Sequence, residues 1–336
     1  MSTIIRRSAL LTFQAAVVLV ISLGLLEALV ALSFRYPAAS PLPLPLLRKM
    51  HELFDRNTIQ VMPECAIYNA NLTYTLRPGQ CTFRNREFSN EFLINRLGVR
   101  DDDASLDQPR VVMLGDSITM GWGVEQDEAF PSVFERLTGQ RTLNAGVSSY
   151  GTVRELRMLE QVDRSALTDL IIQYSANDAK ENQSFVDGTF RVLSRERYER
   201  TVTEQAALLR YHPGKHALNL LVLFRNAVRD RLATTASNHT SSREREVRAF
   251  LHVADQSPVD LTPYRVTVIA IDSEFISLAR SLAATSSSEA VRNMRFIDLS
   301  PATAGPGSFY VLDDHPTRVG HEAIGRVLAE SIEPRD

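Results

Sequence analysis

The sequence predicts an α/β protein with a parallel sheet of five strands, preceded by a single apolar helix. From Arg110 onward, short β-branched runs alternate with longer amphipathic segments, which is the pattern of βαβ units. Each short run is almost continuously apolar, as strands buried on both faces must be. Near the N-terminus, the apolar stretch from Ser8 to Phe34 is long enough at helical rise to cross a membrane.

The composition is that of an ordinary globular protein. The chain has 336 residues, of which 44% are hydrophobic and 23% are charged, so it can bury a sizeable core. Its formal net charge of -3 provides no basic excess for binding phosphate backbones. The sequence therefore argues against a nucleic acid partner.

We predict that residues 1–7 form a cytoplasmic N-terminus and that residues 8–34 form a transmembrane signal anchor. Arg6 and Arg7 precede the apolar stretch, so the positive-inside rule places the rest of the chain in the periplasm or another extracytoplasmic space. The membrane is thus a predicted partner of the N-terminal helix.

Two features of this stretch leave alternatives open. Ala31 and Ser33 are small residues suited to cleavage of a signal peptide, but the stretch exceeds the roughly 7 to 15 apolar residues of a usual signal core, which favours an anchor. Glu27 either snorkels from the outer end of the span or faces a partner helix.

Residues 35–108 are predicted to form a stalk and a small extension without chemistry of its own. The prolines of RYPAASPLPLPLL favour an extended spacer, and TYTLRPGQCTF predicts a hairpin around Pro78 and Gly79. Cys65 and Cys81, the two cysteines of the chain, are predicted to form a disulfide in an oxidising compartment. Closing that loop stabilises the fold by about 3 kcal/mol, and two unpaired buried thiols are the alternative.

Residues 109–336 are predicted to form the main domain. Its strands are RVVMLG (110–115), RTLNAG (141–146), DLIIQYS (169–175), RVTVIAID (265–272) and MRFIDLS (294–300), with helices around AFPSVFERL, TVRELRMLEQV and SEFISLARSLAA. Residues 180–262 are a long insertion and a candidate lid, with helical patches and a polar loop at TTASNHTSSRERE.

Polar residues follow three of these strands, where ligands bind in open α/β sheets. Ser117 lies in Gly-Asp-Ser after the first strand, at a predicted helix N-terminus that favours developing negative charge. Gly146 follows the second strand, and Asn177 and Asp178 follow the third. Taken singly, each has a structural reading, as a helix cap for Asp116 or Ser117 and as turn residues for the others.

A histidine with acidic neighbours lies near the C-terminus. Asp313, Asp314 and His315 precede Pro316 and a predicted final helix. Two carboxylates beside an imidazole are what a general base held in one tautomer requires.

Together, these four segments resemble the SGNH hydrolases, also called GDSL esterases and lipases, over roughly two thirds of the chain. The four residues that name the family match in order: Ser117 in LGDSIT, Gly146 in LNAGVSSYG, Asn177 in SANDAKEN and His315 in DDHPTRVGH. The resemblance implies a three-layer α/β/α sandwich related to flavodoxin. It also implies Ser117 as nucleophile, His315 as general base, and an oxyanion hole of Ser117, Gly146 and Asn177.

The chain departs from the family pattern in two places. The commonest spacing places the acid three residues before the histidine, which is Leu312 here. Many envelope-associated relatives resemble an Asp-x-His pattern instead, so Asp313 is predicted to orient His315, with Asp314 as the fallback. Ser175 and Ala176 stand where many relatives carry glycine before the asparagine.

We therefore predict a membrane-anchored serine esterase that cleaves an acyl group, with acetyl one candidate, from an envelope glycan or lipid. Trp122 and Asp314 are candidate substrate contacts, although Trp122 could equally pack the loop against the core. No metal or organic cofactor is predicted, and envelope biosynthesis proteins are candidate partners. The alternatives are an O-acyltransferase using the same triad and a non-catalytic envelope-binding module.

Overall fold

The computed structural model describes residues 2–233 and 239–332, which belong to two compact units. The smaller unit comprises Met1–Arg56, Ala206–Ala236 and Val311–Asp313. The larger unit comprises Asn57–Gln205, Ser237–Tyr310 and Asp314–Asp336.

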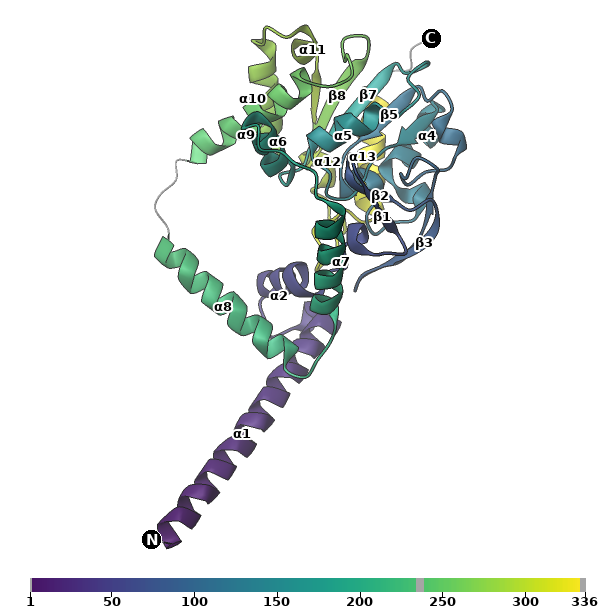
Figure 1. Cartoon of the computed structure of the whole chain (residues 1–336). Helices are drawn as coiled ribbons and strands as arrows, with labels where there is room; N and C mark the ends of the chain where they lie inside the picture. The colour runs from purple at the N-terminus through teal and green to yellow at the C-terminus, as the bar shows by residue number, and fades with distance from the viewer. Residues whose placement is uncertain (1, 234–238, 333–336) are drawn as a thin grey trace. The chain divides into compact units, whose positions relative to one another are not determined.

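The larger unit contains the five predicted strands in one parallel sheet (Figure 1). They are β5 (Val111–Leu114), β6 (Thr142–Asn144), β7 (Asp169–Gln173), β8 (Arg265–Ala270) and β9 (Arg295–Asp298). Their order is β6-β5-β7-β8-β9, and every pairing is parallel. This is the flavodoxin-like order, in which ligands bind at the switch point beside the first strand. The predicted fold class is confirmed.

Helices cover both faces of this sheet. Successive residues of a strand point to opposite sides, so each strand packs against helices on both faces. On β5, Val111 and Met113 pack with helices α4 and α13, whereas Val112 and Leu114 pack with α5, α9 and α10. The bounds are α4 (Phe130–Thr138), α5 (Thr152–Leu159), α9 (His239–Asp255), α10 (Ser273–Ala284) and α13 (Arg318–Ser331). The result is the predicted three-layer sandwich.

Shorter elements complete this unit. They are the helices α3 (Ser117–Met120), α11 (Glu289–Arg292) and α12 (Ser300–Thr303), and the 3-10 turns η3 (Ile59–Val61), η4 (Ala104–Leu106) and η5 (Gln126–Glu128).

The segment predicted as a long insertion is helical throughout much of its length. It contains α7 (Arg195–Leu209), α8 (Lys215–Ala233) and most of α6 (Asp178–Val186), and it ends after α9. The polar loop predicted at TTASNHTSSRERE is wrong for residues 239–246, which form the first turns of α9, while residues 234–238 lie outside the described residues. The polar turns are stabilised by ion pairs such as that of Arg243 with Glu246, a contact that apolar periodicity does not reveal.

The extension before β5 contains two antiparallel hairpins. Strand β1 (Ala66–Asn69) pairs with β2 (Thr73–Leu76), and β3 (Gly79–Arg84) pairs with β4 (Ser89–Ile94). The predicted hairpin around Pro78 and Gly79 is therefore wrong. The N–H of Leu76 donates to the Gly98 carbonyl and Pro78 has no N–H, so β2 and β3 have other partners.

The disulfide predicted between Cys65 and Cys81 is present. It links the start of the first hairpin to β3 and lies in an apolar cluster with Phe83, Phe92 and Trp122.

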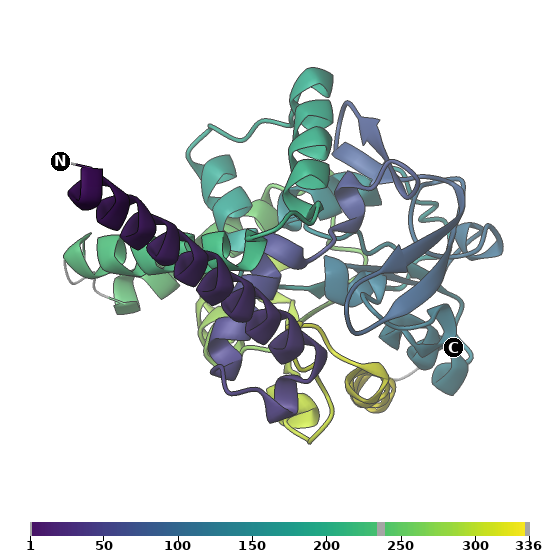
Figure 2. The same ribbon diagram turned by 90° about the horizontal axis from the view of Figure 1, so that it is seen from below.

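The smaller unit is built on the long helix α1 (Ser2–Arg35), drawn in purple in Figure 1 and seen from below in Figure 2. Its segment Leu10–Arg35 is long and apolar enough to cross a membrane. Toward its C-terminal end, Val30 and Phe34 are buried against Leu47 and Met50.

The chain after α1 is not the extended stalk that its prolines predict. It forms the 3-10 turn η1 (Pro37–Ala39), helix α2 (Leu44–Met50) and a π-helical turn, η2 (His51–Asp55). Pro43 and Pro45 lie at the start of α2, where no backbone N–H is needed, so they begin a helix instead of preventing one.

Candidate active site

Ser117 is the first residue of α3 and follows β5 after a tight turn. The turn requires Gly115, because a Cβ atom there would lie 2.1 Å from Thr119 Oγ1. Asp116 is the residue that caps α3, accepting a hydrogen bond from the N–H of Ile118 at 3.1 Å. The Ser117 hydroxyl is thus not used as the cap.

The Ser117 hydroxyl is paired with His315. Ser117 Oγ lies 2.8 Å from His315 Nε2, and both residues are buried, with 7% and 8% exposure. The N–H of Tyr310 donates to the His315 carbonyl at 3.2 Å, which ties the backbone of the histidine loop. The structure therefore brings together the predicted nucleophile and the predicted base.

The two aspartates before His315 have different surroundings. Asp314 has a side chain that is 78% exposed, and its Oδ1 lies 3.4 Å from His315 Nδ1. Asp313 belongs to the smaller unit, where its buried carboxylate lies 3.8 Å from His51 Nε2 and 3.7 Å from Arg56 Nη1. The consecutive residues Asp313, Asp314 and His315 are also the described side chains that could hold a metal ion.

Two of the three predicted oxyanion-hole donors, Gly146 and Asn177, have partners within the chain. The N–H of Gly146 donates to Asn144 Oδ1 at 3.0 Å, and the side chain of Asn177 is hydrogen-bonded to the Asp116 carboxylate. Each of these two donors would have to leave its present partner before it could bind an oxyanion. The oxyanion hole stays a prediction.

Trp122 is 2% exposed and stacks on the His315 imidazole, with ring centroids 4.5 Å apart and planes 15° from parallel. Its other contacts include Phe83, at 4.6 Å between centroids, and Phe88. Packing against the core, the alternative stated for this residue, is thus what the structure shows. Its contact with substrate stays a prediction.

Sequence reasoning missed Arg100, which fixes the turn that carries Trp122. Arg100 is 1% exposed, and its guanidinium donates to the carbonyls of Gly121 at 2.6 Å and Val124 at 2.8 Å. Burial lowers the pKa of Arg100 to about 9, still above neutral pH. No motif marks this arginine, because its partners lie more than twenty residues away in the chain.

Three buried carboxyl groups, those of Asp116, Glu155 and Asp178, lie close to one another. Burial raises the pKa of Asp116, and it raises the pKa values of Glu155 and Asp178 further because each also feels the charge of its carboxylate neighbours. Both oxygens of Glu155 lack a hydrogen-bond partner among the described residues. Protonation of one of these carboxyl groups would lower the repulsion among the three. Sequence reasoning missed Glu155, which lies within the amphipathic helix α5.

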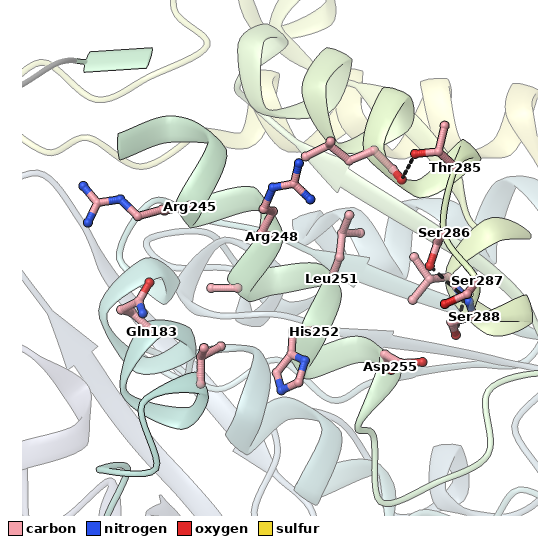
Figure 3. Close-up of a pocket in the computed structure, with 14 residues that line it drawn as sticks. Gln183, Arg245, Arg248, Leu251, His252, Asp255, Thr285, Ser286, Ser287 and Ser288 are labelled. Carbon is pink, nitrogen blue, oxygen red and sulfur yellow. Dashed lines mark hydrogen bonds between the residues drawn. The ribbon is translucent and has the colours of Figure 1, made fainter. Parts of the chain in front are cut away.

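A separate cavity of about 540 Å³ lies among α6, α9, α10 and the chain that follows α10 (Figure 3). Its lining includes Arg245, Arg248, His252 and Ser286–Ser288, but none of the predicted site residues. We assign it no part in the chemistry of Ser117.

A flavodoxin-like sheet with a serine and a histidine paired beside its first strand defines the class of SGNH-type hydrolases. The comparison with family models agrees, since the GDSL-like Lipase/Acylhydrolase family matches residues 113–323. The chain belongs to this family and is an ester-hydrolysing enzyme of the SGNH superfamily.

Solved structures similar to this chain include a G-D-S-L family protein from Desulfitobacterium hafniense DCB-2, with 12% identity, 66% of this chain and 98% of that chain covered, and a TM-score of 0.37. Another is phospholipase A1 from Streptomyces albidoflavus NA297, with 15% identity, 67% and 98% coverage, and a TM-score of 0.34. The family assignment rests on the family model. Comparison with curated proteins gave no match.

Gly146 provides a test of the close packing at this site. A Cβ atom at Gly146 would lie 2.4 Å from the Met120 backbone N, so Gly146→Ala must displace backbone beside α3. We expect a loss of about 1–3 kcal/mol in the free energy of unfolding, together with loss of esterase activity. Urea unfolding and ester hydrolysis measure the two effects.

Gly305→Ala is the matched control, because the nearest atom to its added Cβ would be Ser308 Oγ at 3.7 Å. It should change the unfolding free energy by less than about 0.5 kcal/mol. Equal effects of the two substitutions would show that the contact at Gly146 is not restrictive.

Proposed function

We propose that this enzyme hydrolyses an acyl ester, with acetyl one candidate, on a cell-envelope glycan or lipid, using Ser117, His315 and Asp313 as a catalytic triad. The observation that carries the proposal is the 2.8 Å contact between Ser117 Oγ and His315 Nε2. A serine hydroxyl attacks an ester poorly unless a base removes its proton, and this imidazole nitrogen is within reach of that proton.

In the first half of the reaction, His315 Nε2 takes the Ser117 proton while Ser117 Oγ bonds to the carbonyl carbon. The tetrahedral intermediate then expels the alcohol, which receives the proton from His315. In the second half, His315 takes a proton from water while the water oxygen bonds to the acyl carbon. This second intermediate then breaks its bond to Ser117 Oγ, which receives the proton from His315, and the acid is released. Amide donors around the oxyanion stabilise both intermediates.

For His315 to accept at Nε2, its proton must lie on Nδ1, where a carboxylate can hold it. Asp313 is our choice for this role because its carboxylate is buried, and a buried charge is less screened by water. Asp314 is the weaker candidate, since its side chain is exposed and its 3.4 Å contact is longer than a usual hydrogen bond.

The proposed location and substrate rest on the N-terminal half of the chain. An apolar helix preceded by Arg6 and Arg7 supports a single-pass anchor with a cytoplasmic N-terminus. The disulfide between Cys65 and Cys81 supports an oxidising, extracytoplasmic compartment for the catalytic unit. An esterase held at that surface would meet acylated envelope glycans and lipids.

The triad is tested by steady-state hydrolysis of para-nitrophenyl acetate by the purified full chain in detergent. Ser117→Ala and His315→Ala should each lower kcat by about 10⁴-fold or more. Asp313→Asn should lower kcat on the order of 10⁴-fold, because the amide favours the wrong imidazole tautomer, whereas Asp314→Asn should change it less than about tenfold.

Thermal unfolding of each variant controls for misfolding. A larger loss with Asp314→Asn than with Asp313→Asn would reverse our assignment of the orienting acid. Full activity of Ser117→Ala would exclude Ser117 as the nucleophile.

Product analysis separates hydrolysis from transfer by the same acyl-enzyme. With an acetyl ester donor and an oligosaccharide acceptor, we expect free acetate and no acetylated sugar by mass spectrometry. Accumulation of acetylated oligosaccharide, dependent on Ser117, would instead identify an O-acyltransferase.

A further inference from the structure

Helix α8 (Lys215–Ala233) carries a row of exposed apolar side chains within the smaller unit. Leu218, Leu221, Phe224 and Val228 are 52%, 62%, 68% and 42% exposed. Their spacings of three, three and four residues place them along one side of the helix. Exposing a row of large apolar side chains to water is unfavourable, so we expect this side of α8 to be covered by a partner.

The opposite side of α8 is already packed within its own unit. Leu220 and Leu223 contact the cluster that contains Val30 and Phe34 of α1. His216 is buried, and its ring lies 5.7 Å from the Phe34 ring. The exposed row is therefore a second apolar surface, separate from the one that attaches α8 to α1.

Glu27 of the apolar helix α1 fixes where α8 begins. Its carboxylate accepts hydrogen bonds from the backbone N–H groups of His216, at 3.1 Å, and Ala217, at 3.3 Å. These N–H groups lie in the first turn of α8, where a helix has unpaired donors and a positive dipole. The contact explains a charged residue inside an apolar segment, and it joins the start of α8 to α1 at Glu27.

The length of α1 up to Glu27 matches the thickness of a membrane. Glu27 lies twenty positions after Arg7, the last basic residue before the apolar stretch, and at a rise of about 1.5 Å per residue this distance is about 30 Å. The hydrocarbon core of a bilayer is also about 30 Å thick. With Arg7 at one boundary of the membrane, Glu27 and the start of α8 lie at the other. The span is then shorter than the predicted residues 8–34, and Val30 and Phe34 lie outside the bilayer, where they pack against Leu47 and Met50.

An arginine within the exposed row of α8 suits a lipid surface. Arg225 lies in the exposed row, between Leu221 and Val228, and is exposed itself. An arginine can keep its guanidinium among phosphate headgroups while its stem and the neighbouring apolar side chains enter the acyl region. A protein partner would leave unexplained why the row begins at the depth where α1 leaves the bilayer.

We propose that α8 is an interfacial helix that lies on the outer surface of the membrane, with Leu218, Leu221, Phe224 and Val228 buried among lipid acyl chains. This inference rests on the proposed insertion of α1 and adds a second contact with the same bilayer. Two contacts restrict the tilt of the smaller unit on the membrane, which a single spanning helix does not do.

Tryptophan quenching by brominated lipids tests the proposal on the full chain in phosphatidylcholine vesicles. Phe224→Trp reports on α8, Leu19→Trp on the middle of α1, and Glu52→Trp is the control on an exposed polar position of the same unit. The native Trp122 contributes a constant background, measured with the unsubstituted protein.

We expect lipids brominated near the glycerol end of their chains to quench Phe224→Trp, with blue-shifted emission, and lipids brominated near the methyl ends to quench Leu19→Trp. Glu52→Trp should show neither effect. Quenching of Leu19→Trp without quenching of Phe224→Trp would overturn the inference and leave the anchor intact. If the emission of the unquenched Phe224→Trp were blue-shifted, protein and not lipid would cover α8, and the inference would again be overturned. Absence of quenching at both positions would overturn the anchor and the inference together.

Discussion

The hydrogen bond between Ser117 and His315 is the contact on which the proposed chemistry depends. It joins residues 198 positions apart, one at the end of the first sheet strand and the other in the loop before the last helix. The contact depends on the tertiary fold, since β5 is placed inside the sheet and α13 packs with α4 on one face of β5. A bridge between Phe309 and Pro316 then closes the loop that carries the histidine.

The imidazole also depends on residues from the extension before β5. Trp122 lies flat on the His315 ring, and Phe83 and Phe88 pack against Trp122. Arg100 donates hydrogen bonds to the carbonyls on either side of the turn that carries Trp122. The buried guanidinium thus fixes the Trp122 ring, and this ring in turn fixes the His315 imidazole. The extension therefore serves the site through packing, although none of its residues touches the Ser117 hydroxyl among the contacts described. Burial of a guanidinium with bonds to several carbonyls is a rigid arrangement, since losing any one bond leaves a polar group unsatisfied.

The parts of the structure that follow local periodicity could be predicted from sequence. Five apolar runs gave the five strands, and Ser117 and His315 were found because each lies in a recognisable block of residues. Contacts between distant segments were not predictable in this way. The N–H of Leu76 bonds to Gly98 and not to the predicted hairpin partner. Ion pairs of Arg243 stabilise the helix that forms in a polar stretch, and packing of Leu47 and Met50 stabilises the helix that forms in the proline-rich segment. Arg100 and Glu155 were missed for the same reason.

The central claim is that His315 activates Ser117 for attack on an acyl carbon, and covalent labelling tests it most directly. The full chain would be treated with a fluorophosphonate and digested, and the modified peptide sequenced by mass spectrometry. The account predicts one phosphonyl group on Ser117 and a labelling rate that falls by orders of magnitude in His315→Ala. A folded protein that acquires no adduct, or acquires it on another serine at an unchanged rate in His315→Ala, would contradict the account.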